Sequence, residues 1–153
     1  MILIFGASYG IVIATKLMLA GYDVTCVCKI DEALIINKDG FTLELPGYLN
    51  KNLKISSQEL PGKILALTPE DVNLENINLV FLAMQEAQYK DSNIEMLLTN
   101  IAKQKIPSVS IMNIPPYSYL KNFNLTNLDR IKTLYKSYDI WEKFDLKFLT
   151  HCS

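Results

Sequence analysis

Short apolar runs alternate with stretches of helical period along most of this chain. Continuous apolar or β-branched runs predict buried strands at 2–5, 23–28, 64–67, 79–84 and 109–112. The segment 11–20 is apolar nearly all round and predicts a buried helix. Apolar side chains spaced three and four apart predict another helix, which opens at the Ser92-x-x-Glu95 capping box. Strands that alternate with helices are typical of βαβ units, so the sequence predicts an α/β fold with a parallel sheet.

Turn and capping signals predict the remaining elements. We expect Asp31 to cap a brief helix over 32–37, followed by a turn at Lys38-Asp39-Gly40, which has the Asp-Gly signal. Thr68 followed by Pro69 is typical of a helix start. The other expected elements are hairpin-like strands at 41–45 and 53–56, a helix over about 128–138 and a last strand at 144–149.

Length, charge and cysteine content narrow the class of protein. The chain has 153 residues, half of them hydrophobic, which suits one domain with a packed core. A formal net charge of −1 argues against a nucleic-acid partner. Three cysteines provide neither a disulfide framework nor a zinc site, so we expect reduced thiols and no metal. Polar residues interrupt the apolar segment 1–20, so we expect a cytoplasmic protein with no membrane partner.

The most informative segment is the glycine-containing loop Gly6-Ala7-Ser8-Tyr9-Gly10, which lies between the first strand and the first helix. A dinucleotide-binding fold requires this context, because the first glycine permits a tight turn and the helix N-terminus attracts a pyrophosphate. The usual fingerprint is G-x-G-x-x-G, and here Ser8 takes the place of the second glycine. Gly10 and Ala14 would let the helix pack closely on the strand. We therefore predict a Rossmann-type, doubly wound, mostly parallel sheet with helices on both faces.

The same loop also has the G-x-S-x-G pattern of a nucleophile elbow. Ser8 precedes the only histidine, His151, with Asp139 and Asp145 between them, which is the order of an α/β-hydrolase triad. A serine hydrolase is therefore an alternative. It is disfavoured because only one short strand precedes the serine and no glycine run resembles an oxyanion hole.

The end of the second strand bears on the choice of cofactor. NAD-binding folds place an acidic residue there to hold the ribose 2′-hydroxyl, but this chain has Lys29. A cation suits the 2′-phosphate of NADP, so we predict NADP, and nearby Asp31 leaves NAD as the alternative.

Several segments together resemble the N-terminal half of the ketopantoate reductase-like enzymes, in the 6-phosphogluconate dehydrogenase-like group of NADP-binding proteins. The resemblance covers about residues 1–115. It rests on the loop Gly6–Gly10, on 20–25 (AGYDVT, close to the family's AGHDVT), on Asp39-Gly40, and on the segments 79–88 and 110–113.

The resemblance implies further cofactor-binding residues at the ends of the fourth and fifth strands. The family has a lysine after the fourth strand and a glutamine three residues later; here these positions are Gln85 and Gln88, next to Met84. Asn113 matches the asparagine of the family's Q-N-G segment, although Ile114 replaces the glycine. Because an amide carries no charge, the loss of the lysine puts ketopantoate itself in doubt as the substrate.

The resemblance also implies what the chain lacks. We expect a dinucleotide-binding domain over 1–115 and a C-terminal extension over 116–153 that packs on the sheet edge, without the family's helical substrate domain. The function expected is that of an NADP-binding part of an oxidoreductase acting on a small keto or hydroxy acid, inactive in isolation. The catalytic acid is unidentified, with His151 and Lys121 the only candidates. A catalytically silent nucleotide-binding or redox-sensing module is the alternative, and an uncovered apolar surface would favour a homodimer.

Overall fold

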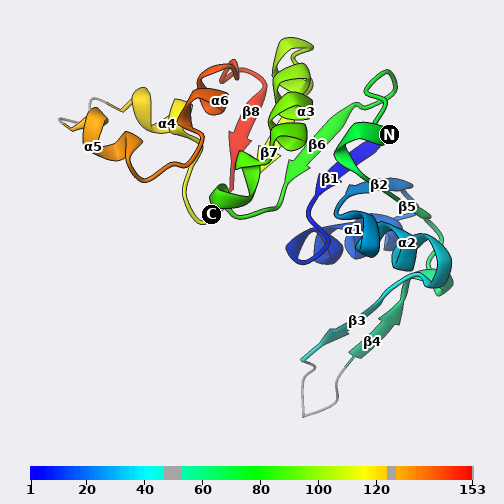
Figure 1. The fold of residues 1–153 in the computed structure, drawn as a ribbon. Coiled ribbons are helices and arrows are strands. Elements are labelled where there is room, and N and C mark those ends of the chain that lie inside the picture. The colour runs from blue at the N-terminus through cyan, green and yellow to red at the C-terminus, as the bar shows by residue number, and fades with distance from the viewer. Residues whose placement is uncertain (47–52, 124–126, 153) are drawn as a thin grey trace.

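A six-stranded, entirely parallel sheet forms the centre of the molecule (Figure 1). The computed structural model describes residues 1–46, 53–123 and 127–152. The sheet order is β5-β2-β1-β6-β7-β8, which is 3-2-1-4-5-6 when its strands are numbered along the chain. This is the strand order of the doubly wound dinucleotide-binding folds, so the predicted fold class is confirmed. The strands are β1 (Ile2–Phe5), β2 (Val24–Val27), β5 (Ile64–Leu67), β6 (Leu79–Leu82), β7 (Ser108–Ser110) and β8 (Leu149–His151).

Helices cover both faces of this sheet. Leu3 and Phe5 of β1 belong to the core cluster that includes α3 (Ser92–Lys103), whereas Ile4 packs with α1 (Tyr9–Leu19). This division follows from the two-residue period of a strand, which sends successive side chains to opposite faces. α2 (Ile30–Asp39) lies on the same side as α1, and α3 lies on the other side (Figure 1).

The hairpin-like strands are confirmed as an antiparallel pair outside the main sheet. β3 (Thr42–Leu45) and β4 (Leu53–Ser56) pair with each other and project away from the sheet between α2 and β5 (Figure 1). The expected turn at 38–40 is wrong, because Lys38 and Asp39 end α2 and Gly40 caps it with a φ of 71°. The Asp-Gly pair therefore serves a helix C-terminus rather than a turn between strands.

Short 3₁₀ turns lie at several strand and helix ends. The helix expected after Thr68 is a single turn, η3 (Pro69–Asp71), in which the Thr68 hydroxyl donates to Asp71. The other turns are η2 (Ser57–Glu59) and η4 (Glu86–Lys90).

The C-terminal segment differs most from expectation. The long helix expected over 128–138 is present only as α5 (Leu128–Lys132), and α6 (Tyr138–Glu142) begins where the expected helix ends. These helices and α4 (Tyr117–Lys121) lie on the β8 side of the sheet, with α6 next to β8 (Figure 1). The last strand starts at Leu149 rather than at 144, because Phe144 belongs to the turn after α6 and Asp145 forms the next turn. Within the described residues, no helix has both the length and the apolar character needed to cross a bilayer.

A side chain hydrogen-bonds to the backbone of each edge strand of the main sheet. The carboxamide of Asn37 donates to the Ala66 carbonyl at 2.7 Å and accepts its N–H at 2.8 Å on β5. On β8, the Tyr119 hydroxyl donates to the Leu149 carbonyl at 2.7 Å and accepts the His151 N–H at 3.1 Å. Each side chain therefore pairs with two of the backbone groups that an edge strand offers to a further strand.

Candidate functional site

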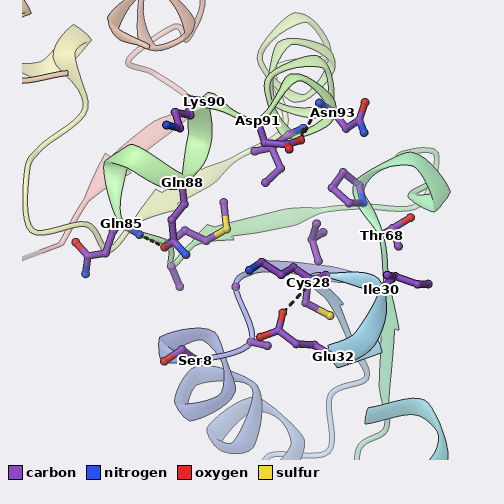
Figure 2. Close-up of a pocket in the computed structure, with 18 of the residues that line it drawn as sticks. Ser8, Cys28, Ile30, Glu32, Thr68, Gln85, Gln88, Lys90, Asp91 and Asn93 are labelled. Carbon is purple, nitrogen blue, oxygen red and sulfur yellow. Dashed lines mark hydrogen bonds between the residues drawn. The ribbon is translucent and has the colours of Figure 1, made fainter. Parts of the chain in front are cut away.

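A cleft of about 1410 Å³ opens at the carboxyl ends of the sheet strands (Figure 2). It is larger than most small-molecule sites, which measure about 300–1,000 Å³. Residues that follow β1, β2, β5 and β6 line it. β1 and β6 are neighbours whose connections lead through α1 on one face and α3 on the other, so the cleft lies at the point where the strand order reverses. Ligands of open α/β sheets bind at such a point.

The floor of the cleft is the turn from β1 into α1. Gly6 has a φ of 95°, donates its N–H to Val27 at 2.9 Å, and has no room for a Cβ, which would lie 2.8 Å from Met84 Cγ. Ala7, Ser8 and Tyr9 then line the cleft. Ser8 is the N-cap residue of α1, and its hydroxyl makes no capping hydrogen bond. The first N–H groups of a helix have no partner within it, so this turn offers main-chain donors and a free hydroxyl to a bound anion.

Gly10 has a structural role rather than a place in the cleft. A Cβ there would lie 2.8 Å from Ile4 Cγ2 and 3.4 Å from the Phe5 carbonyl oxygen. The predicted close packing of α1 on the first strand is therefore confirmed at Gly10, and Ala14 is also fully buried.

The turn from β2 into α2 forms one wall. Lys29 lines the cleft and donates its backbone N–H to the Glu32 carboxylate at 3.0 Å. Lys29, and not Asp31, is the N-cap residue of α2, which corrects the expected start of this helix. Figure 2 shows the Glu32 carboxylate folded back toward this turn. A cationic residue and a carboxylate held by a backbone N–H therefore lie together at this wall of the cleft.

Two cysteines lie behind the same wall. Cys28 follows β2 and lines the cleft, while Cys26 lies on β2 and is fully buried. The Cys26 thiol donates to the Gly6 carbonyl oxygen at 3.7 Å. The interaction between the two thiols lowers the pKa of Cys28, and the same interaction together with burial raises the pKa of Cys26. Within the described residues, no three histidine, cysteine, aspartate or glutamate side chains converge as a metal site would require.

The opposite wall is the segment after β6. Met84, Gln85 and Gln88 line the cleft, and the Gln88 side chain extends from η4 back to the Gln85 backbone (Figure 2). The Gln88 side-chain oxygen accepts the Gln85 N–H at 2.8 Å, and the Gln88 N–H donates to the Gln85 carbonyl at 2.9 Å. These two bonds make the pair one rigid unit.

The start of α3 closes the far end of the cleft. Asp91 caps this helix by accepting the N–H groups of Asn93 and Ile94, so the helix begins one residue earlier than the Ser92 capping box predicts. Several residues that line the cleft were not among the predicted site residues. Each of them comes after β2, β5 or β6 in the chain, and this position after a strand is the sequence signal that could have identified them. They are Ile30, Glu32, Thr68, Pro69, Glu70 and the segment from Lys90 to Ile94.

The structure brings most of the predicted site residues together. Gly6, Ala7, Ser8, Tyr9, Lys29, Met84, Gln85 and Gln88 all line the one cleft. Gly10 lies beneath it, and Asn113 lies beyond β7 outside the lining of the described cleft.

The residues of the hydrolase alternative are not assembled. Strand pairing places Phe5, Leu82, Ser110 and His151 in one row across the sheet. Three strand spacings separate Phe5 from His151, which is about 14 Å. The His151 ring nitrogen instead lies 3.4 Å from Ser110 Oγ, away from the loop that carries Ser8.

Two solved structures that share this fold have been assigned as reductases. One is a protein assigned as a ketopantoate reductase from Ralstonia solanacearum MolK2, with a TM-score of 0.58 and 17% identity over 99% of this chain. Another is a protein assigned as the 2-dehydropantoate 2-reductase panE from Bacillus subtilis, with a TM-score of 0.53 and 18% identity over 81% of this chain. The alignments span 43% and 38% of those chains, less than half of either. No protein-family model and no curated protein matches the sequence.

Proposed function

We propose that this protein binds a nicotinamide dinucleotide in the cleft, NADP rather than NAD. We further propose that it is the cofactor-binding part of a ketopantoate reductase-like oxidoreductase acting on a small keto or hydroxy acid. One observation carries the proposal: the turn Gly6–Tyr9, which lies at the N-terminus of α1, lines a large cleft at the reversal of a 3-2-1-4-5-6 sheet. The reductase assignments of two structures with this fold support the choice of cofactor class.

The lining residues divide the cleft into regions that match the parts of a dinucleotide. The N–H groups at the start of α1 and the Ser8 hydroxyl suit the pyrophosphate. The β2–α2 turn with Lys29 suits the adenosine ribose and its phosphate, and the amides of Gln85 and Gln88 suit the ribose on the nicotinamide side. When bound, the nicotinamide would donate or accept the hydride.

A catalytically silent nucleotide-binding module is the second candidate. It is favoured by Gln85, a neutral amide at the position where the reductase resemblance implies a lysine. Reduction of a keto acid needs a proton donor at the carbonyl oxygen, and an amide is not an acid. The two candidates share the cofactor cleft and differ only in turnover.

Isothermal titration of the chain with NADPH and with NADH tests the proposal. We expect saturable binding with one site per chain and a preference for NADPH. A charge-assisted bond contributes about 1.5–3 kcal/mol, so Lys29→Ala should weaken NADPH binding by roughly tenfold or more and leave NADH binding nearly unchanged. Lys38→Ala, an exposed lysine at the far end of the same helix, is the matched control. Absence of saturable binding to either cofactor would refute the proposal.

A further inference from the structure

The short turn that carries Gln85 and Gln88 has two differently used faces. A 3₁₀ helix has three residues per turn, so side chains three positions apart lie on one face. Gln85 and Gln88 line the cleft, whereas Glu86 and Tyr89 are buried, with 6% and 0% exposure. The orientation of the amide pair therefore depends on what holds the buried face.

The segment before α6 holds Glu86. The Glu86 carboxylate accepts the backbone N–H of Lys136 at 2.8 Å and that of Ser137 at 3.3 Å. Burial of a carboxylate is costly unless such donors replace water, so these two N–H groups stabilise the buried position of Glu86. The Ser137 hydroxyl also donates to Glu95 of α3 at 2.6 Å, which anchors the donor segment itself.

α6 and β1 hold Tyr89. Its ring meets Trp141 edge-on, with the ring centres 5.1 Å apart, and lies 6.3 Å from the ring of Phe5. Its hydroxyl accepts the N–H of Met84 at 3.1 Å, so the chain between β6 and η4 is fixed as well. Burial raises the pKa of Tyr89, which keeps the hydroxyl protonated.

We propose that the segment 136–141 positions the Gln85–Gln88 amide pair of the cofactor cleft, and that Glu86 is the positioning residue through which it acts. Residues about fifty positions later in the chain thus set one wall of a cleft that they do not line. For cofactor binding, the inference rests on the function proposed above.

Two substitutions at Glu86 separate positioning from charge. Glu86→Gln keeps a side-chain oxygen that can accept the Lys136 N–H, whereas Glu86→Ala removes it. We expect Glu86→Ala to weaken NADPH binding about tenfold, which is about 1.4 kcal/mol, and Glu86→Gln to remain within threefold of the wild type. Lys136→Ala keeps the backbone donor and should have no effect. An unchanged dissociation constant in Glu86→Ala, at intact circular dichroism, would overturn the inference.

A double-mutant cycle with Gln88→Ala tests whether Glu86 acts through the amide pair. In a Gln88→Ala protein, which lacks the side-chain carboxamide, the further change Glu86→Ala should weaken NADPH binding by no more than twofold. An equal loss in both backgrounds would mean that Glu86 affects general stability instead.

Hydrogen exchange gives a readout that needs no cofactor. The Gln88 and Met84 amides donate within this unit, so Glu86→Ala should speed their exchange at least tenfold while the amides of α1 are unaffected. If the wild type binds no dinucleotide but shows this change, the proposed function fails and the positioning role stands. If exchange at Gln88 and Met84 is unchanged, the positioning role fails.

Discussion

Gly10 is the residue at which packing depends most directly on the absence of a side chain. A Cβ there would lie 2.8 Å from Ile4 Cγ2, and Ile4 is fully buried between the sheet and α1. Overpacking of this kind costs about 1–3 kcal/mol, so we expect Gly10→Val to lower the free energy of unfolding by about that amount in urea titrations. Ser8→Ala, which removes no capping bond, should change it by less than about 0.5 kcal/mol. A Gly10→Val protein as stable as the wild type would contradict this packing.

Glu32 should act against Lys29 in the choice between NADP and NAD. Its carboxylate is bound to the Lys29 N–H, near the position proposed for the 2′-phosphate. A 2′-phosphate with two negative charges and a carboxylate with one, separated by about 8 Å of water, repel each other by about 1 kcal/mol. Removing the carboxylate charge in Glu32→Gln should therefore raise the preference for NADPH over NADH by roughly fivefold. Titration calorimetry at low salt measures this ratio, and high salt should reduce the change.

Neutralising a carboxylate elsewhere controls for net charge in this experiment. Glu44 lies on β3, pairs with Lys54 at 2.7 Å and is remote from the cleft lining. Glu44→Gln should leave the cofactor ratio unchanged. A Glu32→Gln protein with the wild-type ratio would show that Glu32 does not face the phosphate.

The sequence alone identified site residues whose position depends only on neighbouring residues in the chain. Gly6 and Ser8 could be placed at a cleft because a strand, a turn and a helix follow one another there. The positions of capping residues were predicted less accurately, because Lys29 and Asp91 replace the expected Asp31 and Ser92. Each helix starts earlier than its capping signal implies, and of these two residues only Asp91 accepts helix N–H groups through its side chain. The partners of Glu86 could not be predicted, since they lie fifty residues away.

At the scale of elements, the helix expected over 128–138 shows where pattern reasoning fails. Its apolar spacing is helical, yet Leu134 is 60% exposed while Tyr135 is buried. The N–H groups of Lys136 and Ser137 bind Glu86 rather than carbonyls one turn earlier, so the helix cannot continue through them. A tertiary contact thus overrides a correct local periodicity.

The backbone groups at the edge of the sheet provide a test at the scale of elements. Asn37→Ala would leave the N–H and carbonyl of Ala66 unpaired on β5. Two lost hydrogen bonds correspond to about 1–3 kcal/mol, so we expect that loss of stability in urea and increased self-association in light scattering. Lys38→Ala, an exposed substitution on the same helix, should do neither. A monomeric Asn37→Ala protein of wild-type stability would show that the carboxamide does not protect the edge.

At the scale of the whole molecule, sequence predicted the fold class because alternating apolar strands and helices leave few ways to bury both faces of a sheet. It did not predict that β8 joins the sheet as a parallel sixth strand starting at Leu149. Phe144 is instead buried beside Trp141, so the aromatic run there belongs to the core around α6. Short C-terminal elements depend on tertiary packing, which periodicity does not report.

We expect the chain to bind NADPH without oxidising it. The family resemblance implies a lysine at the position of Gln85, and the amide of Gln85 cannot protonate a carbonyl. Absorbance at 340 nm with a panel of small keto acids should therefore remain at the background rate. Turnover above background by this chain would show that its own residues supply the acid.

Mapping the cofactor onto the backbone by NMR tests the central claim most directly. In a titration of the labelled chain with NADPH, the account predicts saturable shifts at the amides of Ala7, Ser8 and Tyr9, with further shifts near Lys29 and Gln88. The amides of the β3–β4 hairpin should not move. Saturation without shifts at the turn into α1, or no saturable change at all, would contradict the account.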